Sequence, residues 1–284
     1  GMATILRGAP VAAALSEALM RRSMALRERG ITPVLAIVRV GERPDDISYE
    51  IGAIKRCDKT GINVRQFCLP AACTRQELLA VITEINRNSG IHGCLMFRPL
   101  PNREDEAAAC ELLAPEKDVD CMTASSLSSV FTGHGAGYPP CTAQACIELL
   151  DHYGVGLRGK RVTVIGRSLV IGKPVSMMLQ SRDATVTMCH TKTADTPAAC
   201  QNAEILVVAA GKAGMLDERF VHPGQIVVDV GIHVNSEGKL CGDVQFDRVA
   251  PIVEAITPVP AGVGSVTATV LAKHVIEAAE KTLC

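Results

Sequence analysis

Runs of apolar residues alternate with amphipathic segments along the first half of the chain. The short apolar runs, such as Val34–Val40 before Gly41, are typical of buried strands. The longer segments repeat apolar residues at helical spacing, and one of them opens with Thr74 and Glu77 in the positions of a capping box. We expect strands at Val34–Val40, Val64–Leu69 and Gly93–Phe97, and helices at Asp46–Thr60, at Thr74–Ser89 and through Val11, Leu15, Leu19 and Leu26 as far as Gly30.

The same alternation resumes after a segment rich in Gly and Pro, Thr132–Thr142, which is the best candidate for a domain junction. Alternating strands and helices indicate a mostly parallel sheet with helices on its faces, and this second half resembles a Rossmann unit. We expect two α/β domains, one formed by residues 2–142 plus 267–284 and a Rossmann-type domain formed by 143–266. The expected elements are strands at Arg161–Ile165, Thr185–Cys189, Ile205–Ala210 and Ile226–Val230, and helices at Ala143–Tyr153, Gly172–Ser181 and Thr267–Thr282.

Composition narrows the classes of function. Of the 284 residues, 48% are hydrophobic and 21% are charged, a balance that suits a globular protein and excludes disorder. The net charge of -1 argues against general binding of nucleic acid or anionic lipid, and an aromatic content of 3% argues against base-stacking surfaces. No uncharged apolar run reaches the roughly 20 residues that span a bilayer. We therefore expect neither a nucleic-acid partner nor a membrane partner.

The twelve cysteines indicate a reducing compartment. They are scattered and contain no Cys-x-x-Cys pair, so we expect reduced thiols in a cytoplasmic protein and no metal site. Residues 3–29 carry five arginines and few acids, a faint sign of a transit peptide. Their helical spacing favours an ordinary amphipathic first helix instead.

One turn has the character of a phosphate-binding site. An apolar strand runs into Gly166, and Gly172 opens the next helix, whose N-terminal amides favour anions. The spacing is not that of the common dinucleotide fingerprint, so a structural turn fits the pattern about as well as a nucleotide site. Arg167 and Ser168 favour the nucleotide, because a guanidinium and a hydroxyl suit a 2′-phosphate or a pyrophosphate.

Three further segments are weaker evidence when each is taken alone. Lys117–Asp120 carries two acids beside a lysine but also fits a solvated loop. Tyr49 lies on an expected helix with Lys55 and Lys59, which is a common arrangement. Pro258–Gly264 is dense in Pro and Gly, which fits either a tight structural turn or a backbone shaped around a ligand.

The combination is far more specific than its parts. It strongly resembles the bifunctional methylenetetrahydrofolate dehydrogenase/methenyltetrahydrofolate cyclohydrolase family over residues 4–282. The residues that carry the resemblance are, in chain order, Val40-Gly41, Tyr49, Gly61-Ile62, Pro99-Leu100-Pro101, Lys117–Asp120, Pro140-Cys141-Thr142, Gly166-Arg167-Ser168 with Gly172 and Pro174, Thr185–His190, Asp229–Ile232, Gly242-Asp243-Val244 and Pro258–Gly264.

The resemblance implies a reaction and a set of site residues. Members transfer a hydride from 5,10-methylenetetrahydrofolate to NADP, or in some members to NAD, and then hydrolyse the methenyl product to 10-formyltetrahydrofolate. The implied fold has two α/β domains with folate between them and the cofactor on the second, and members are commonly homodimers. The implied folate-binding residues are Tyr49, Ala53, Met96, Phe97, Arg98, Asp120, Pro260, Ala261, Gly262, Val263 and Gly264, of which Tyr49 and Asp120 are expected to be catalytic. The implied cofactor-binding residues are Gly166, Arg167, Ser168, Thr191 beside Lys192, and Ile232.

The chain departs from the family pattern where the cyclohydrolase chemistry takes place. The family has a lysine four residues after the tyrosine, which assists proton transfer around the attacking water, and here that position is Ala53. The family glutamine that hydrogen-bonds this lysine is here Phe97, followed by Arg98, which is either a surface residue or a partner for folate carboxylates. Lys55 lies about 200° around the helix from Ala53 and should point elsewhere. Ala261 replaces the usual glycine, and Ser265 and Val266 replace the usual Pro-Met.

Because the lysine and its partner are missing together, we expect an NADP-dependent methylenetetrahydrofolate dehydrogenase that has lost most of its cyclohydrolase activity. Hydride transfer needs orientation and no obligatory protein base, whereas hydrolysis needs an activated water. Two alternatives stay open. One is the full bifunctional enzyme, and the other is a non-catalytic relative that binds folate or nucleotide, against which Tyr49, Asp120 and the Gly166 turn argue.

Overall fold

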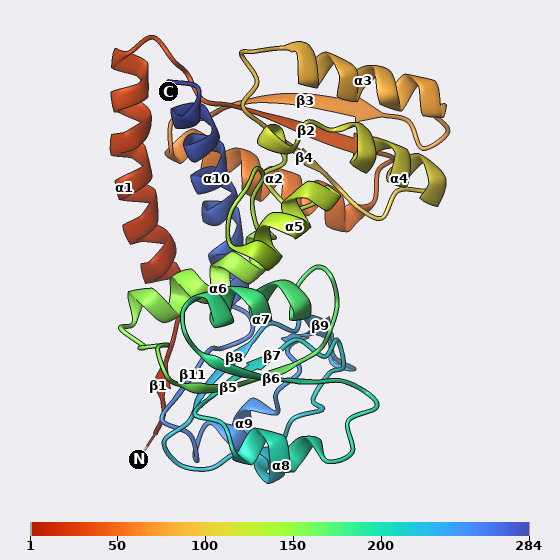
Figure 1. Cartoon of the computed structure of the whole chain (residues 1–284). Helices are drawn as coiled ribbons and strands as arrows, with labels where there is room; N and C mark the ends of the chain where they lie inside the picture. Colours follow the sequence, from red (N-terminus) through yellow and green to blue (C-terminus); the bar gives the residue numbers. More distant parts are fainter. Residues whose placement is uncertain (1, 284) are drawn as a thin grey trace. The chain divides into compact units, whose positions relative to one another are not determined.

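The computed structural model describes residues 2–283, which form two compact units (Figure 1). One unit contains the described residues up to 13 together with 142–267, and the other contains 14–141 together with 268–283. The sequence pattern had placed residues 2–13 with the first half of the chain. In the structure β1 (Thr4–Ile5) pairs in parallel with β11 (Ala255–Ile256), so this segment adds a strand to the sheet of the other unit.

The unit of residues 14–141 is built on a three-stranded parallel sheet with the order β3-β2-β4. Side chains of β2 alternate between its faces: Ala36, Val38 and Val40 pack with α3 and α4, which leaves Leu35 and Ile37 on the opposite face. The elements of this part of the chain are β2 (Val34–Val40), α2 (Pro44–Lys59), β3 (Asn63–Leu69), α3 (Arg75–Arg87), β4 (Gly93–Met96), α4 (Arg103–Leu112), η1 (Pro115–Lys117) and α5 (Ala124–Thr132). Helices α1 (Gly8–Glu28) and α10 (Thr267–Lys281) each begin in one unit and continue in the other.

Local sequence signals set several of these boundaries. The Thr74–Glu77 capping box is present, with the Thr74 hydroxyl accepting the Glu77 amide and the Glu77 carboxylate accepting the Thr74 amide, each at 3.1 Å. Gly30, past the end of α1, has a φ of 81°, a conformation that favours glycine. Asn102 caps α4, a helix that the apolar pattern did not reveal because only Ala109 of its residues is buried.

The unit of residues 142–267 contains a six-stranded parallel sheet with the order β1-β11-β8-β7-β5-β6 (Figure 1). Helix α7 lies on one face, and α8 and α9 lie on the other. Strand β7 (Ile205–Val208) is buried along its whole length, which explains its unbroken apolar run. The remaining elements are α6 (Cys141–His152), β5 (Arg161–Ile165), α7 (Gly172–Ser181), β6 (Thr185–Cys189), α8 (Thr196–Gln201), η2 (Glu218–Phe220), β8 (Ile226–Asp229), β9 (His233–Val234), β10 (Leu240–Cys241), α9 (Phe246–Val249) and η3 (Val263–Ser265).

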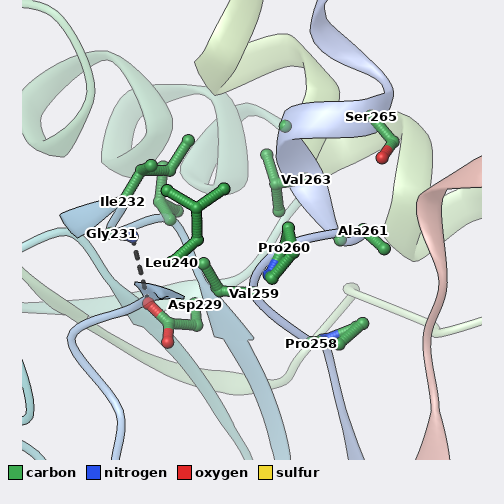
Figure 2. A pocket seen from close by; sticks show the side chains of 13 residues that line it. Asp229, Gly231, Ile232, Leu240, Pro258, Val259, Pro260, Ala261, Val263 and Ser265 are labelled. Carbon is green, nitrogen blue, oxygen red and sulfur yellow. Dashed lines mark hydrogen bonds between the residues drawn. The ribbon is translucent and has the colours of Figure 1, made fainter. Parts of the chain in front are cut away.

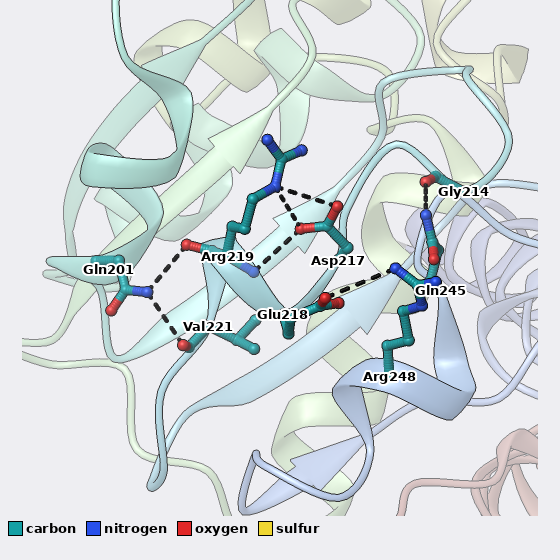
Figure 3. Close-up of polar contacts among 8 residues, drawn as sticks. All are labelled: Gln201, Gly214, Asp217, Glu218, Arg219, Val221, Gln245 and Arg248. Atoms are coloured by element: carbon teal, nitrogen blue, oxygen red, sulfur yellow. Dashed lines mark hydrogen bonds and ion pairs between the residues drawn. The ribbon is translucent and has the colours of Figure 1, made fainter.

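The side-chain amides of Gln201 and Gln245 donate hydrogen bonds to the loop between β7 and β8 (Figure 3). Gln201 donates to the carbonyl oxygens of Arg219 and Val221 at 3.0 and 3.1 Å, and Gln245 donates to that of Gly214 at 2.8 Å. These bonds satisfy backbone acceptors that no strand partner reaches. They hold the connection from β7 to β8 in one conformation.

Candidate active site

In the segment Lys117–Asp120, Lys117 and Asp118 hydrogen-bond to the protein itself, whereas Asp120 keeps acceptor positions for a ligand. Lys117 Nζ donates to the carbonyl oxygens of Ile85, Asn86 and Asn88, so it satisfies acceptors at the C-terminal end of α3. The Asp118 carboxylate is fully buried and accepts the amides of residues 122 and 123 and the hydroxyls of residues 123 and 126. Neither residue is solvated as an exposed loop would be, and neither has much capacity left for a ligand.

Asp120 is the acid of this segment that remains available. It is partly exposed, and Oδ1 accepts the amide of Cys141 at 2.9 Å. Burial raises the pKa of Asp120, while the Cys141 donors and the positive charge of Arg98 act in the opposite direction. Burial and the neighbouring Asp120 carboxylate raise the pKa of the Cys141 thiol well above its ordinary value, so the thiol stays a donor. Because a carboxylate has about four acceptor positions, Asp120 can still accept hydrogen bonds from a ligand.

Tyr49 and Phe97 form an aromatic pair in the same unit. Their rings meet edge to face with centroids 5.7 Å apart. Tyr49 is 37% exposed and Phe97 only 9%. The surrounding protein raises the pKa of Tyr49 by desolvating the phenolate, and Cys141 and Asp120 oppose its charge further, which places Tyr49 in the surroundings of Asp120. One aromatic face is therefore available to a planar ligand near that carboxylate.

Ala53 lies one helical turn after Tyr49 on α2 and has no exposed surface. The family resemblance implies that Ala53 binds folate, but in this structure its side chain is covered and offers no surface to a ligand. Lys55, two positions further, is exposed. Met96, which the resemblance also implies to bind folate, packs in the core with Val38 and Leu100 and is 2% exposed, so its side chain offers little surface to a ligand.

The turn after β5 has the shape of an anion site. A Cβ on Gly166 would collide with the carbonyl oxygen of Ala209, and one on Gly172 with that of Gly166, so only glycine allows these close approaches. The amides of Ile171 and Gly172 donate to Ser168 Oγ at 3.1 and 3.4 Å, and that of Lys173 to Ser168 O. The helix N-terminus expected to bind phosphate is thus already capped.

The backbone amides that are free to bind an anion lie in the turn that precedes α7. Within residues 2–283, the backbone amides of 167–170 donate to no other residue, and the side chains of Arg167 and Ser168 are exposed. The turn after β6 lies beside them, because β5 and β6 are parallel neighbours and Gly166 N donates to Cys189 O at 2.8 Å. That second turn is held by His190, whose Nδ1 accepts the Lys192 amide, and it leaves Thr191 and Lys192 exposed. Four amides, two hydroxyls and two cations are available at this edge of the sheet.

A pocket in the same unit brings together two sets of predicted residues (Figure 2). Ile232, expected on the cofactor side, lines it together with Pro260–Gly264, expected on the folate side, and Ile232 Cδ1 lies 3.5 Å from a Cβ built on Gly264. Its volume is about 240 Å³. A cavity of about 150 Å³ holds benzene, so this pocket has room for a single heterocyclic ring.

The loop that forms one wall of this pocket is held in an unusual conformation. Ala261 has a φ of 76°, in the left-handed region that favours glycine, which explains why the family has glycine there. Its carbonyl oxygen accepts the amide of Gly8 at 2.9 Å. The peptide bond before Pro260 is cis, as is the bond before Pro99.

Two buried aspartates, Asp229 and Asp243, hold the loops beside the pocket through hydrogen bonds to backbone amides. From the sequence alone, neither of them had an assigned role. Asp229 accepts the amides of Gly231, Asp243 and Val244, and burial raises its pKa to about 6. Asp243 accepts the amides of residues 210–212 and contacts His233 Nε2 at 2.7 Å. Both aspartates fall in motifs that the sequence had singled out, so the motif was the only signal available.

Comparison with known proteins agrees with this geometry. Residues 6–120 match the catalytic domain of the tetrahydrofolate dehydrogenase/cyclohydrolase family, and residues 140–283 match its NAD(P)-binding domain. The chain belongs to this family. Its two domains have the expected mostly parallel α/β architecture, with a Rossmann-type NAD(P)-binding domain.

Relatives and solved structures resemble the chain along its whole length. It is 49% identical to the bifunctional protein FolD of Clostridioides difficile over 96% of both chains, and 48% identical to that of Carboxydothermus hydrogenoformans over 98% of both. The bifunctional enzyme FolD of Campylobacter jejuni superposes with a TM-score of 0.94 at 35% identity, covering 98% of this chain and 99% of that one. The Trypanosoma brucei dehydrogenase-cyclohydrolase complexed with NADP and an inhibitor gives 0.92 at 32% identity, covering 100% and 99%.

None of the helices within residues 2–283 is both long and apolar enough to cross a membrane. In the same residues, no three side chains of His, Cys, Asp or Glu come together as a metal-binding group.

Proposed function

We propose that this member of the family is an NADP-dependent 5,10-methylenetetrahydrofolate dehydrogenase with weak or absent cyclohydrolase activity. The observation that carries the proposal is the pair Ala53 and Phe97. A fully buried methyl group stands where the family has its lysine, and a ring packed on Tyr49 stands where the family has the glutamine.

The dehydrogenase half of the proposal rests on groups that bind and orient. Asp120 has acceptor capacity for the donors of a pterin, and Tyr49 offers it an aromatic face. The pocket of Ile232 and Pro260–Gly264 suits a nicotinamide ring, and the free amides of residues 167–170 suit a diphosphate. When bound by these groups, NADP would supply the acceptor for the hydride of the folate methylene carbon. The protein's contribution is to bind and orient the folate and the cofactor.

NADP is preferred over NAD in this proposal because of the charges at the cofactor edge. Arg167 and Lys192 are exposed cations on the turns after two adjacent strands, and Thr191 adds a hydroxyl. A 2′-phosphate between these turns would receive charge-assisted hydrogen bonds that the NAD ribose cannot use.

Hydrolysis lacks its proton-transfer group. A water that attacks the methenyl carbon must lose a proton, and a positioned acid or base contributes about 10²–10⁴-fold to such steps. Lys55 does not replace the missing lysine, because it lies on an exposed face of α2. The methenyl intermediate should therefore accumulate.

The second candidate is the complete bifunctional enzyme. Relatives that are 49% and 48% identical carry the name bifunctional protein FolD, which favours both activities. Under this candidate another group, such as Arg98, assists the water.

One assay separates the two candidates. The purified protein is given 5,10-methylenetetrahydrofolate and NADP, and NADPH and methenyltetrahydrofolate are followed together by absorbance. The proposal predicts NADPH formation with nearly stoichiometric accumulation of the methenyl product. NADPH without accumulation would favour the bifunctional enzyme, and no NADPH would contradict both candidates.

We also propose that the protein is a cytoplasmic homodimer, as the family resemblance implies. The cysteines in the described part of the chain are free thiols, which suits a reducing compartment. Light scattering after size-exclusion chromatography tests the dimer, since a monomer mass of 30.0 kDa would contradict it.

A further inference from the structure

Arg98 is a partly buried cation that the protein leaves unpaired. Its guanidinium offers five N–H donors, yet among residues 2–283 it forms no hydrogen bond and no ion pair. Arg39 on the neighbouring strand shows the usual arrangement, with Glu50, the Gly41 carbonyl and the Cys68 sulfur as partners. A guanidinium that is withdrawn from water without protein acceptors is a candidate for contact with a ligand.

The backbone brings Arg98 to the neighbourhood of Asp120. Cys94 and Asp118 form a parallel bridge, so β4 and the segment after Lys117 run side by side in the same direction. Arg98, four residues after Cys94, and Asp120, two residues after Asp118, therefore emerge at the same end of the sheet. The charge of Arg98 reaches Asp120 and counteracts the rise that burial causes in its pKa, although the two groups are not paired.

The Asp120 carboxylate accepts hydrogen bonds, and the Arg98 guanidinium donates them. Together they fit a ligand whose edge carries donors next to an acceptor. The pyrimidine ring of a 4-oxopterin has the 2-amino group, N3–H and the C4 carbonyl oxygen in a row, which is a donor–donor–acceptor edge. A carboxylate accepts from the first two groups, and a guanidinium donates to the third. The ring of Tyr49 provides an apolar face in the same surroundings.

We propose that Arg98 is a specificity-determining residue that donates to the C4 carbonyl oxygen of the pterin while Asp120 binds the adjacent amino and N3–H groups. This inference rests on the proposed function for its folate substrate. The consequence is selection at C4. A 4-amino analogue presents a donor to the guanidinium, and a site built to hydrogen-bond one group rejects the analogue that lacks it.

The test compares tetrahydrofolate with its 4-amino analogue, tetrahydroaminopterin, which has an amino group in place of the C4 oxygen and, when neutral, no hydrogen on N3. Dissociation constants are measured by anaerobic calorimetry for the unmodified protein, Arg98→Leu, Arg98→Lys and the matched control Arg103→Leu, an exposed arginine at the start of α4. We expect the unmodified protein to prefer tetrahydrofolate. Arg98→Leu should weaken tetrahydrofolate about 10–100-fold and the analogue less than about 3-fold. Arg98→Lys should lie between these results, and Arg103→Leu should match the unmodified protein.

Equal weakening of both ligands by Arg98→Leu would overturn the inference, because it would mean that Arg98 acts only as a counter-charge for Asp120. An unchanged preference would overturn it as well. NADPH formation by the unmodified protein is measured separately. A protein that reduces NADP but shows a C4 preference independent of Arg98 refutes this inference alone, whereas one that neither binds tetrahydrofolate nor reduces NADP refutes the proposed function too.

Discussion

Restoring the missing pair at positions 53 and 97 should restore hydrolysis only when both residues are changed. Ala53 has no exposed surface, so a lysine introduced there must push its chain through packed atoms and leave its ammonium without a partner. Burial without a partner lowers the pKa of a lysine and destabilises the fold. We expect Ala53→Lys alone to lower the unfolding temperature and raise methenyl hydrolysis by less than about 10-fold.

Phe97→Gln supplies both room and an acceptor. The change removes a nearly buried ring from Tyr49, which should destabilise the protein by about 1–3 kcal/mol. In the double variant the glutamine carbonyl can orient the ammonium beside the bound folate. Because positioned proton transfer is worth about 10²–10⁴-fold, the double variant should exceed the sum of the single changes and approach the lower part of that range.

The assay follows the decay of methenyltetrahydrofolate above its uncatalysed rate for the unmodified protein, both single variants and the double variant, with NADPH formation as the internal reference. Lys55→Ala is the matched control, since Lys55 is an exposed lysine two positions away. Hydrolysis by the unmodified protein as fast as dehydrogenation would refute the reasoning. Loss of hydrolysis in Lys55→Ala would also refute it, because Lys55 would then be the replacement.

Three further changes give separable results. Arg167→Ala should reduce the preference for NADP over NAD about 10–100-fold through the Michaelis constant for NADP, and better use of NAD by the unmodified protein would contradict this. Asp120→Ala should weaken tetrahydrofolate at least about 10-fold and leave NADP binding intact in calorimetry, whereas unchanged folate affinity would reduce Asp120 to a loop acid. Burial lowers the pKa of His274 to about 4, so its neutral form stabilises the fold above about pH 6.5, and this contribution is lost as the pH falls toward 4. Between about pH 7.5 and 5, the free energy of unfolding in urea should fall by about 2 kcal/mol more for the unmodified protein than for His274→Gln. Asp229 is present in both proteins, so its titration cancels in this comparison. An equal fall in the free energy of unfolding for the two proteins would contradict the prediction.

The sequence by itself determined the longer strands, the long helices and the family. Strands β2, β5 and β6 and helix α7 have the bounds that the pattern predicts, because buried parallel strands and amphipathic helices leave strong periodic signals. The motifs placed Asp120, Arg167 and Ile232 on the segments where the structure has them available. The family resemblance also showed that Ala53 stands where the family has a lysine.

Only the tertiary structure decided which of these residues a ligand can reach. Burial depends on what packs from distant parts of the chain, so the pattern could not show that Met96 is in the core or that Ala53 is covered. Short strands were missed for the same reason: two residues such as Thr4–Ile5 become a strand only because β11, about 250 residues later in the chain, lies beside them. Only the structure shows that the Ser168 hydroxyl accepts a backbone amide at the start of α7. It also shows that the Asp118 carboxylate, unlike that of Asp120, accepts so many hydrogen bonds from its own loop that little capacity is left for a ligand.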